Sequence, residues 1–343
     1  MKMKTAIPLF SILIPVYNMS NYLRQCLNSI REQTFTDWEA IFVNDASTDN
    51  SLNILQEYAD KDPRIIIINH EHNKNLYAAR STAIQAARGK YAAFLDADDY
   101  LDRKFLETGK KMIEADDYLL VKMGYKCIHG NQHRSEYPKL SEVISSEDFL
   151  YGGYVLSKYS YVLWGNIYLT EMLKKTDIHY DQPIFDFEDI LRMTNLVTHS
   201  DKKIRIETGK KMYYYRLGAG VHGRKSYSFQ DIEKLLIYPY AYVQALSILP
   251  AVIRESSVQK HGTPEEFCSF ECFRIIVEKM KTKEDFLKGV EAFCKIYGHE
   301  LFHQHLTHCH IVCMKCSFFQ YLKQIFFFLI LAAKHIGKKI LRR

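Results

Sequence analysis

The stretch Tyr91-Ala92-Ala93-Phe94-Leu95-Asp96-Ala97-Asp98-Asp99 is an apolar run that ends in three carboxylates within four residues. The apolar half is typical of a strand that is buried on both faces of a sheet. The carboxylates repel one another, and a divalent cation with oxygen ligands would remove that cost and would also accept phosphate oxygens from a ligand. The alternative is a solvated acidic turn that caps the next helix.

Three further strand-like runs precede this stretch, at residues 10–16, 39–45 and 65–68. Helical patterns separate the runs, at residues 21–33, 51–59 and 77–87. Buried strands that alternate with helices predict an α/β fold with a mostly parallel central sheet flanked by helices. From residue 229 onward the pattern is mostly helical, which predicts a mainly helical C-terminal extension.

Polar side chains follow the predicted strands where a parallel sheet binds its ligands, beyond the carboxyl ends of the strands. Tyr17 follows the first strand and has a ring suited to stacking, although a core tyrosine is an equally good interpretation. Asp45 closes the second strand, where a carboxylate could accept a hydrogen bond from the N–H of a base. Ser47 or Asp49 in the same turn is typical of a helix cap.

The composition indicates a folded protein with a basic end. The chain has 343 residues, of which 47% are hydrophobic and 25% charged, and this excludes a disordered or collagen-like protein for most of its length. The net charge is +6, and residues 301–343 carry seven Lys or Arg and no acidic residue. The remainder therefore has a net charge of 6 − 7 = −1, which makes it a poor nucleic-acid binder.

The ends of the chain indicate where the protein works. The eight cysteines are scattered, and no secretory signal is recognisable around Met1-Lys2-Met3-Lys4, so we expect a cytoplasmic protein with reduced thiols. Residues 325–333 are apolar but too few to span a bilayer. Because basic residues follow, we expect residues 318–343 to contact the inner face of the cell membrane peripherally. The alternative is a helix docked on the protein or on a partner subunit.

Four ordered motifs resemble glycosyltransferase family 2: Ile14-Pro15-Val16-Tyr17-Asn18, Val43-Asn44-Asp45-Ala46-Ser47-Thr48-Asp49, Asn75 with Ala79-Arg80, and the strand with its three carboxylates. The resemblance implies the GT-A fold, which is Rossmann-like, and inverting transfer from a nucleotide-diphosphate sugar. It implies a GT-A domain over residues 1–225, with a nucleotide-binding half at 1–125 and an acceptor half at 126–225. A helical C-terminal region would occupy residues 226–343.

The resemblance also implies roles for single residues. It implies a uracil and nucleotide site lined by Pro15, Tyr17, Asp45 and Arg80. Asp96 would contact the ribose or the metal, and Asp98 would bind Mn²⁺ or Mg²⁺ bridging the diphosphate. The chain departs from the family at Leu76, where glycine is common.

Two motifs downstream belong to the same resemblance. Phe187-Glu188-Asp189 resembles the pair in which the aspartate is the catalytic base, so Asp189 is the predicted base. On the residues alone, an acidic first turn of a helix is the simpler interpretation, and Asp186 is a nearby competitor. Trp164-Gly165-Asn166-Ile167-Tyr168 resembles an element in which a lysine stands where this chain has Asn166.

Together these features predict an inverting, metal-assisted glycosyltransferase. It would move a sugar from a UDP-sugar to a hydroxyl of a saccharide or glycolipid acceptor, in the synthesis of lipopolysaccharide, capsule or a lipid-linked oligosaccharide. One alternative is a catalytically silent scaffold with the same fold. Another is a nicotinamide-dependent oxidoreductase, because residues 218–223 fit G-x-G-x-x-G, although no βαβ unit surrounds them. The His and Cys residues between 303 and 316 suggest a zinc site, for which one helical face with buried cysteines is the alternative.

Overall fold

The computed structural model describes residues 7–129, 132–134, 139–177, 188–217, 244–261, 263, 269, 273, 276, 283–297, 300 and 304–305. The chain divides into two compact units, one of Met1–Gly223 with Ser247–Arg254 and the other of Arg224–Leu246 with Glu255–Arg343. The domain boundaries expected from the sequence stay a prediction. Asp186, the glycine pattern at 218–223 and the basic tail at 318–343 lie outside the described residues, as does most of the His and Cys cluster.

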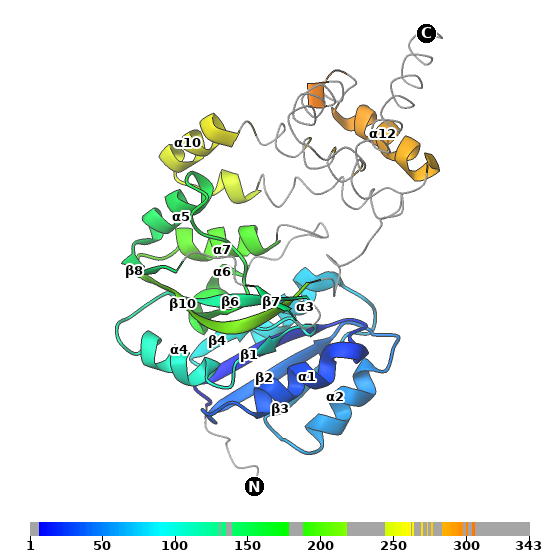
Figure 1. Cartoon of the computed structure of the whole chain (residues 1–343), viewed down its shortest axis with the longest axis vertical. Helices are drawn as coiled ribbons and strands as arrows, with labels where there is room; N and C mark the ends of the chain where they lie inside the picture. Colours follow the sequence, from blue (N-terminus) through cyan, green and yellow to red (C-terminus); the bar gives the residue numbers. More distant parts are fainter. Residues whose placement is uncertain are drawn as a thin grey trace. The chain divides into compact units, whose positions relative to one another are not determined.

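The N-terminal half of the first unit is a parallel sheet (Figure 1). Its strands have the order β3-β2-β1-β4, and their bounds are Ile65–Asn69, Trp38–Asn44, Phe10–Val16 and Tyr91–Phe94. Every residue of β1 and β2 is buried, as continuous apolar runs in a two-sided sheet require. The four strands expected from the sequence are therefore confirmed, with the ends shifted by two residues at most.

The sheet continues beyond β4 with mixed strand directions. In the order β9-β6-β10-β5 the strands are Asn166–Leu169, Leu120–His129, Ile204–Arg216 and Tyr100–Leu101. Strand β9 runs antiparallel to both β4 and β6, whereas β10 runs parallel to β6. Two short strands, β7 (Gln132–Arg134) and β8 (Ser141–Ile144), pair with β6 and β10. The α/β fold with a mainly parallel core is confirmed.

Helices cover both faces of this sheet. Helices α1 (Ser20–Arg31), α2 (Ser51–Ala59) and α4 (Phe105–Ile113) share one hydrophobic cluster with β1 and β2. Helix α3 (Asn75–Ala86) contacts β1 and β2 and also packs on α6 (Thr170–Thr176). The other described helices are α5 (Ser146–Tyr154), α7 (Glu188–Thr198), α10 (Ala251–His261) and α12 (Lys283–Tyr297).

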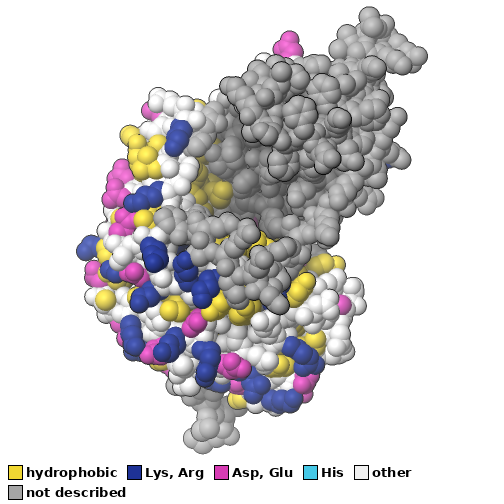
Figure 2. All heavy atoms as spheres, in the orientation of Figure 1, with side chains coloured by type: hydrophobic (Ala, Val, Ile, Leu, Met, Phe, Trp, Pro, Cys, Tyr) yellow, Lys and Arg dark blue, Asp and Glu magenta, His cyan; other side chains and the backbone are white. Residues whose placement is uncertain are grey.

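Ion pairs on the surface contribute little to the stability of the fold. In Figure 2, Lys and Arg side chains are interspersed with Asp and Glu over the described surface. Ion pairs such as Lys111–Glu107 lie in solvent, where such pairs contribute little. Among the described residues, none of the helices combines the length and apolar character that crossing a bilayer requires.

A close backbone approach joins β6 to β10. The pairing between these strands shifts register between Glu207 and Lys211, opposite Gly124. A Cβ atom at Gly124 would collide with the backbone carbonyl oxygen of Thr208. The glycine therefore lets β6 and β10 pair closely around this irregularity.

We predict that Gly124→Ala lowers the free energy of unfolding by about 1–3 kcal/mol, because backbone must move to admit the methyl group. Urea denaturation measures this. Gly209→Ala is the matched control, since its nearest neighbour would be Glu207 Oε1 at 4.0 Å. Equal losses in the two variants would contradict a steric requirement at residue 124.

Candidate active site

Two loops at the carboxyl edge of the sheet are fastened to each other. Asn18, directly after β1, has a left-handed backbone with φ of 55°, which asparagine tolerates better than most residues. Its Oδ1 accepts a hydrogen bond from the N–H of Thr48 at 2.8 Å, and its own N–H donates to Ser47 Oγ at 3.1 Å. Pro15 is buried within β1, whereas Tyr17, directly after that strand, is 42% exposed. The exposed ring is therefore available for stacking.

Asp45 lies beneath this edge and is almost completely buried. Its Oδ1 accepts from the N–H of Lys74 at 2.8 Å and lies 2.7 Å from His70 Nδ1. The other ring nitrogen of His70 lies 2.9 Å from Thr82 Oγ1. Asp45 thus has partners inside the protein, and its contact with uracil stays a prediction. Sequence reasoning missed His70, whose only signal is its place directly after β3.

Helix α3 carries Arg80 to the centre of the site. Its first residue, Asn75, has φ of 77°, and its Oδ1 accepts from the N–H of Ala78 at 3.1 Å. Asn75, and not Leu76, is therefore the residue with the backbone conformation that favours glycine. Five residues later Arg80 is 2% exposed.

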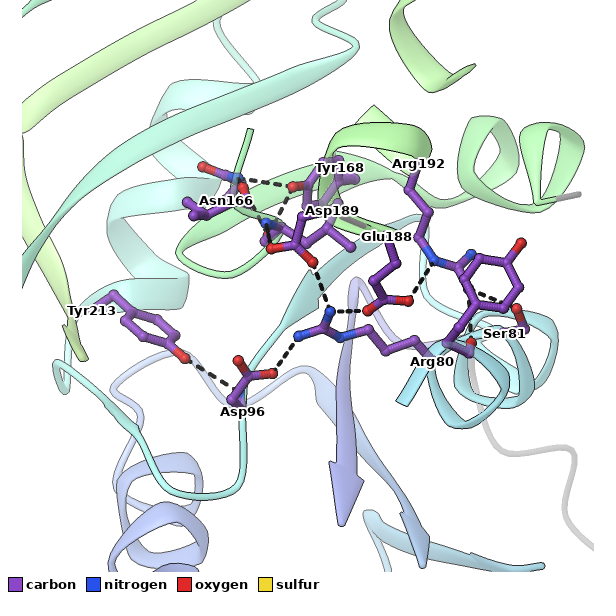
Figure 3. Close-up of polar contacts among 12 residues, drawn as sticks. Arg80, Ser81, Asp96, Asn166, Tyr168, Glu188, Asp189, Arg192 and Tyr213 are labelled. Atoms are coloured by element: carbon purple, nitrogen blue, oxygen red, sulfur yellow. Dashed lines mark hydrogen bonds and ion pairs between the residues drawn. The ribbon is translucent and has the colours of Figure 1, made fainter. Parts of the chain in front are cut away.

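The Arg80 guanidinium binds three carboxylates (Figure 3). Its Nη2 donates at 2.7 Å to Oδ1 of Asp96, which lies two residues after the end of β4. Its Nη1 donates to Asp189 Oδ1 at 2.8 Å and also to Glu188, at the start of α7. Burial acts to lower the pKa of Arg80, but the three carboxylates outweigh it and raise that pKa well above its usual value. Arg80 therefore joins two predicted site residues, Asp96 and Asp189.

Asp189 is a carboxylate of raised proton affinity. Its Oδ2 accepts from the N–H of Leu163 at 3.3 Å, and about a quarter of the side chain (27%) is exposed. Burial raises the pKa of Asp189 to about 6, while Arg80 opposes that rise and Glu188 adds to it. A raised pKa makes Asp189 a stronger base than an ordinary aspartate.

A second arginine, Arg192, lies close to Glu188. Arg192 Nε lies 3.6 Å from Glu188 Oε2 within α7. The same guanidinium pairs with Asp177, and its Nη2 donates to Ser81 Oγ at 2.7 Å (Figure 3). Sequence reasoning missed this residue, because an arginine one turn along a helix gives no signal of the partners it meets. The two arginines fix the N-terminus of α7 against α3.

The third carboxylate of the acidic turn is structural. Asp99 is 1% exposed; its Oδ2 accepts from the Tyr213 hydroxyl and its Oδ1 from the Arg216 N–H, both at 2.7 Å. Burial, followed by the charges of Asp98 and Asp96, raises the pKa of Asp99 well above its usual value. The hydrogen bonds from Tyr213 and Arg216 therefore hold the Asp99 carboxyl inside the protein.

The oxygen atoms around Asp98 limit how a metal ion could be bound in the acidic turn. Asp98 is half-buried, and its carbonyl oxygen accepts from Arg216 Nε at 2.9 Å. In the part of the chain that the structure describes, no group of three His, Cys, Asp or Glu side chains could hold an ion. With Asp96 on Arg80 and Asp99 committed elsewhere, the turn fits Mg²⁺ or Mn²⁺ bound by one or two carboxylates together with substrate phosphates. It does not fit an all-protein cage.

The turn at Trp164–Tyr168 follows Leu163, whose N–H donates to Asp189. Asn166 is fully buried, and its Nδ2 donates to Val162 O and Tyr168 Oη, both at 2.8 Å (Figure 3). Asn166 therefore closes this turn rather than facing a substrate. Trp164 stacks on Tyr213 with ring centroids 4.7 Å apart, which ties the same turn to β10.

Known proteins resemble this chain in sequence. The family described as Glycosyl transferase family 2 matches residues 11–191, more than half of the chain. The chain is 32% identical over 226 residues to Glycosyltransferase GlyA of Streptococcus pneumoniae, covering 61% of this chain and 31% of GlyA. It is 27% identical over 255 residues to the poly(ribitol-phosphate) beta-N-acetylglucosaminyltransferase TarS of Staphylococcus aureus, covering 72% of this chain and 42% of TarS. The chain thus spans less than half the length of both relatives.

Solved structures resemble the fold. TarS 1–349 in complex with UDP-GlcNAc has a TM-score of 0.58 at 19% identity, over 86% of this chain and 90% of that one. The mannosyltransferase PcManGT from Pyrobaculum calidifontis, in complex with GDP-Man and Mn²⁺, has a TM-score of 0.53 at 16% identity, over 96% of this chain and 87% of that one. At such identities the likeness concerns the fold alone.

We predict that Arg80→Met lowers the free energy of unfolding at pH 7 by about 3–5 kcal/mol, because it leaves buried carboxylates without their cation. Without Arg80 the pKa of Asp189 rises further, so the folded variant binds more protons than the unfolded chain and loses stability as pH rises. Urea denaturation at pH 5.5 and pH 8 measures the loss, which should be smaller at pH 5.5.

Arg24→Met serves as the control, because Arg24 pairs with Glu57 in solvent. Its stability should change little at either pH. A penalty for Arg80→Met that is the same at both pH values would contradict the assigned charge balance.

Proposed function

The chain belongs to glycosyltransferase family 2, and on that premise we propose that it is an inverting glycosyltransferase that acts on a UDP-sugar. One observation carries the proposal: Arg80 binds both Asp96, in the acidic turn after β4, and Asp189, in the first turn of α7. The likeness to TarS in complex with UDP-GlcNAc supports UDP as the nucleotide. The acceptor would be a hydroxyl of a saccharide or glycolipid in surface-glycan synthesis, as the relationship to a poly(ribitol-phosphate) transferase supports.

In the proposed reaction Asp189 takes a proton from the acceptor hydroxyl. As that oxygen forms a bond to C1 of the sugar, the bond from C1 to the diphosphate oxygen breaks, and its electron pair leaves with the diphosphate. Such general-base assistance typically contributes ~10²–10⁴-fold. The Leu163 N–H and Arg80 hold the two carboxylate oxygens, which fixes the direction in which Asp189 faces.

The leaving group decides what else the site needs. A hydrolase that cleaves a glycosidic bond uses a second carboxylic acid to protonate the leaving oxygen. A diphosphate leaves without protonation, provided its growing charge is neutralised. Asp98, together with Asp96, would hold Mn²⁺ or Mg²⁺, which supplies that neutralisation when bound. Arg216, whose Nε donates to the Asp98 carbonyl, brings a further cation to the same turn.

The membrane contact rests on the sequence alone. We propose that the protein works at the inner face of the cell membrane through residues 318–343, where an apolar run is followed by five basic residues. Each basic residue near an anionic surface contributes roughly 1 kcal/mol. A lipid-linked acceptor would be delivered at that surface.

We predict that Asp189→Asn retains UDP affinity but loses turnover at least ~100-fold, because the amide cannot take the proton. Asp98→Ala should lose the Mn²⁺-dependent part of UDP binding. Calorimetry with UDP and Mn²⁺ measures binding. Hydrolysis of UDP-GlcNAc, UDP-Glc, UDP-Gal, UDP-GalNAc and GDP-Man measures turnover.

Asp117→Asn is the control, since that side chain is 75% exposed and far along the chain from the acidic turn. Near wild-type turnover in Asp189→Asn would refute the base. A wild-type protein that binds UDP but hydrolyses no donor would be a scaffold, and binding of NAD in place of UDP would indicate an oxidoreductase.

We predict that the full chain floats with liposomes of phosphatidylglycerol and phosphatidylethanolamine, whereas a chain ending at residue 317 does not. The basic residues are attracted to the anionic lipid, so flotation should weaken as salt increases. Liposomes of phosphatidylcholine are the control. Equal flotation of the two chains would rule out this tail as the anchor.

A further inference from the structure

Lys122 is a charged residue in the buried middle of β6. It is 4% exposed, and its neighbours Val121 and Met123 are buried in the hydrophobic core. Among the described residues, the Lys122 ammonium has neither a hydrogen bond nor an ion pair, although the backbone of the residue pairs with β9 and β10. Burying an ammonium group without a partner destabilises the folded protein. A strand position that would accept an apolar residue retains a cation, which points to a role in the chemistry of the site.

The pocket around Lys122 adjoins the turn that holds the base. Lys122 lines this small pocket together with Val162 and Trp164. These two residues flank Leu163, whose N–H donates to Asp189 Oδ2 at 3.3 Å. The segment Val162–Trp164 therefore forms one wall of the pocket and also supplies the hydrogen bond that directs Asp189.

The neighbouring strand ties Lys122 to that turn a second time. In the pairing of β6 with β9, the register partner of Lys122 is Asn166, which places the two side chains on the same face of the sheet. Asn166 closes the turn through its bond to Val162 O, while its own Oδ1 is buried without a hydrogen-bond partner among the described residues. Ser160 Oγ, in the same pocket, is likewise unpartnered there. Nothing described in the pocket neutralises the ammonium.

Asp189 is the carboxylate that acts on Lys122. Burial lowers the pKa of Lys122 to about 8, and the charge of Asp189 opposes that fall. Because coupling between two sites is reciprocal, the cation lowers the pKa of Asp189 in return. The titratable groups that face Asp189 are Arg80, Glu188, Asp96, Lys122 and Tyr168. Arg80 divides its charge among three carboxylates, whereas Lys122 has Asp189 alone.

We propose that Lys122 is a positioning residue for the transfer: its buried ammonium keeps Asp189 ionised when an acceptor excludes water from the site. The inference rests on the proposed role of Asp189 as base. Exclusion of water would otherwise favour the protonated carboxylic acid, which cannot take a proton. A cation that is already desolvated opposes this without any reorganisation during the reaction.

The first test compares Lys122→Met with the charge-preserving Lys122→Arg. The pH dependence of kcat/KM for hydrolysis of UDP-GlcNAc with Mn²⁺ is measured, because it reports groups of the free enzyme. We expect the acid limb of Lys122→Met to move upward by about 0.5–1 pH unit, with UDP affinity unchanged, and Lys122→Arg to restore the wild-type limb. An unmoved acid limb in Lys122→Met would overturn the proposal.

A second measurement needs no turnover, so it separates this inference from the proposed function. In protein with ¹³C-labelled lysine, the Lys122 side-chain signal is identified by its loss in Lys122→Met and titrated by NMR. Asp189→Asn should lower the pKa of Lys122, and the control Asp117→Asn should leave it unchanged. A Lys122 titration that is the same in Asp189→Asn and wild type would overturn the coupling, whatever donor the protein uses.

Discussion

The charge balance at Arg80 is the interaction on which the site depends. One buried guanidinium holds Asp96 from the end of β4 and the pair Glu188 and Asp189 from the start of α7. These carboxylates come from segments more than ninety residues apart, and without a shared cation they would repel one another. The fold places Arg80 there because α3 packs on β1 and β2 and its left-handed first residue directs the helix along the sheet.

The sequence predicts the local part of this arrangement well. The strands and the helices between them are visible because apolar periodicity is a property of neighbouring residues. The acidic turn was interpreted as a cluster that a cation must hold together, and this was incomplete. Asp99 is tied to Tyr213, which lies 114 residues away, and Asp96 to Arg80. Periodicity and motif spacing carry no information about such partners, and the buried charges of Arg192 and Lys122 were missed for the same reason.

The site combines two kinds of positive charge: arginines that belong to the protein, and a metal ion that would enter with the ligand. The protein supplies fixed cations to its own carboxylates, through Arg80 and Arg192. Arg80 directs Asp189 and opposes the rise of its pKa that burial causes. The acidic turn keeps few oxygens for a metal, so an ion there would be held largely by the diphosphate that it accompanies.

A crystal structure with UDP and Mn²⁺ tests this account most directly. The account requires Mn²⁺ between Asp98 and the diphosphate oxygens, while the Arg80 guanidinium keeps its bonds to Asp96 and Asp189. A diphosphate bound directly by Arg80, with Asp189 released from the guanidinium, would contradict it. So would manganese held away from Asp98.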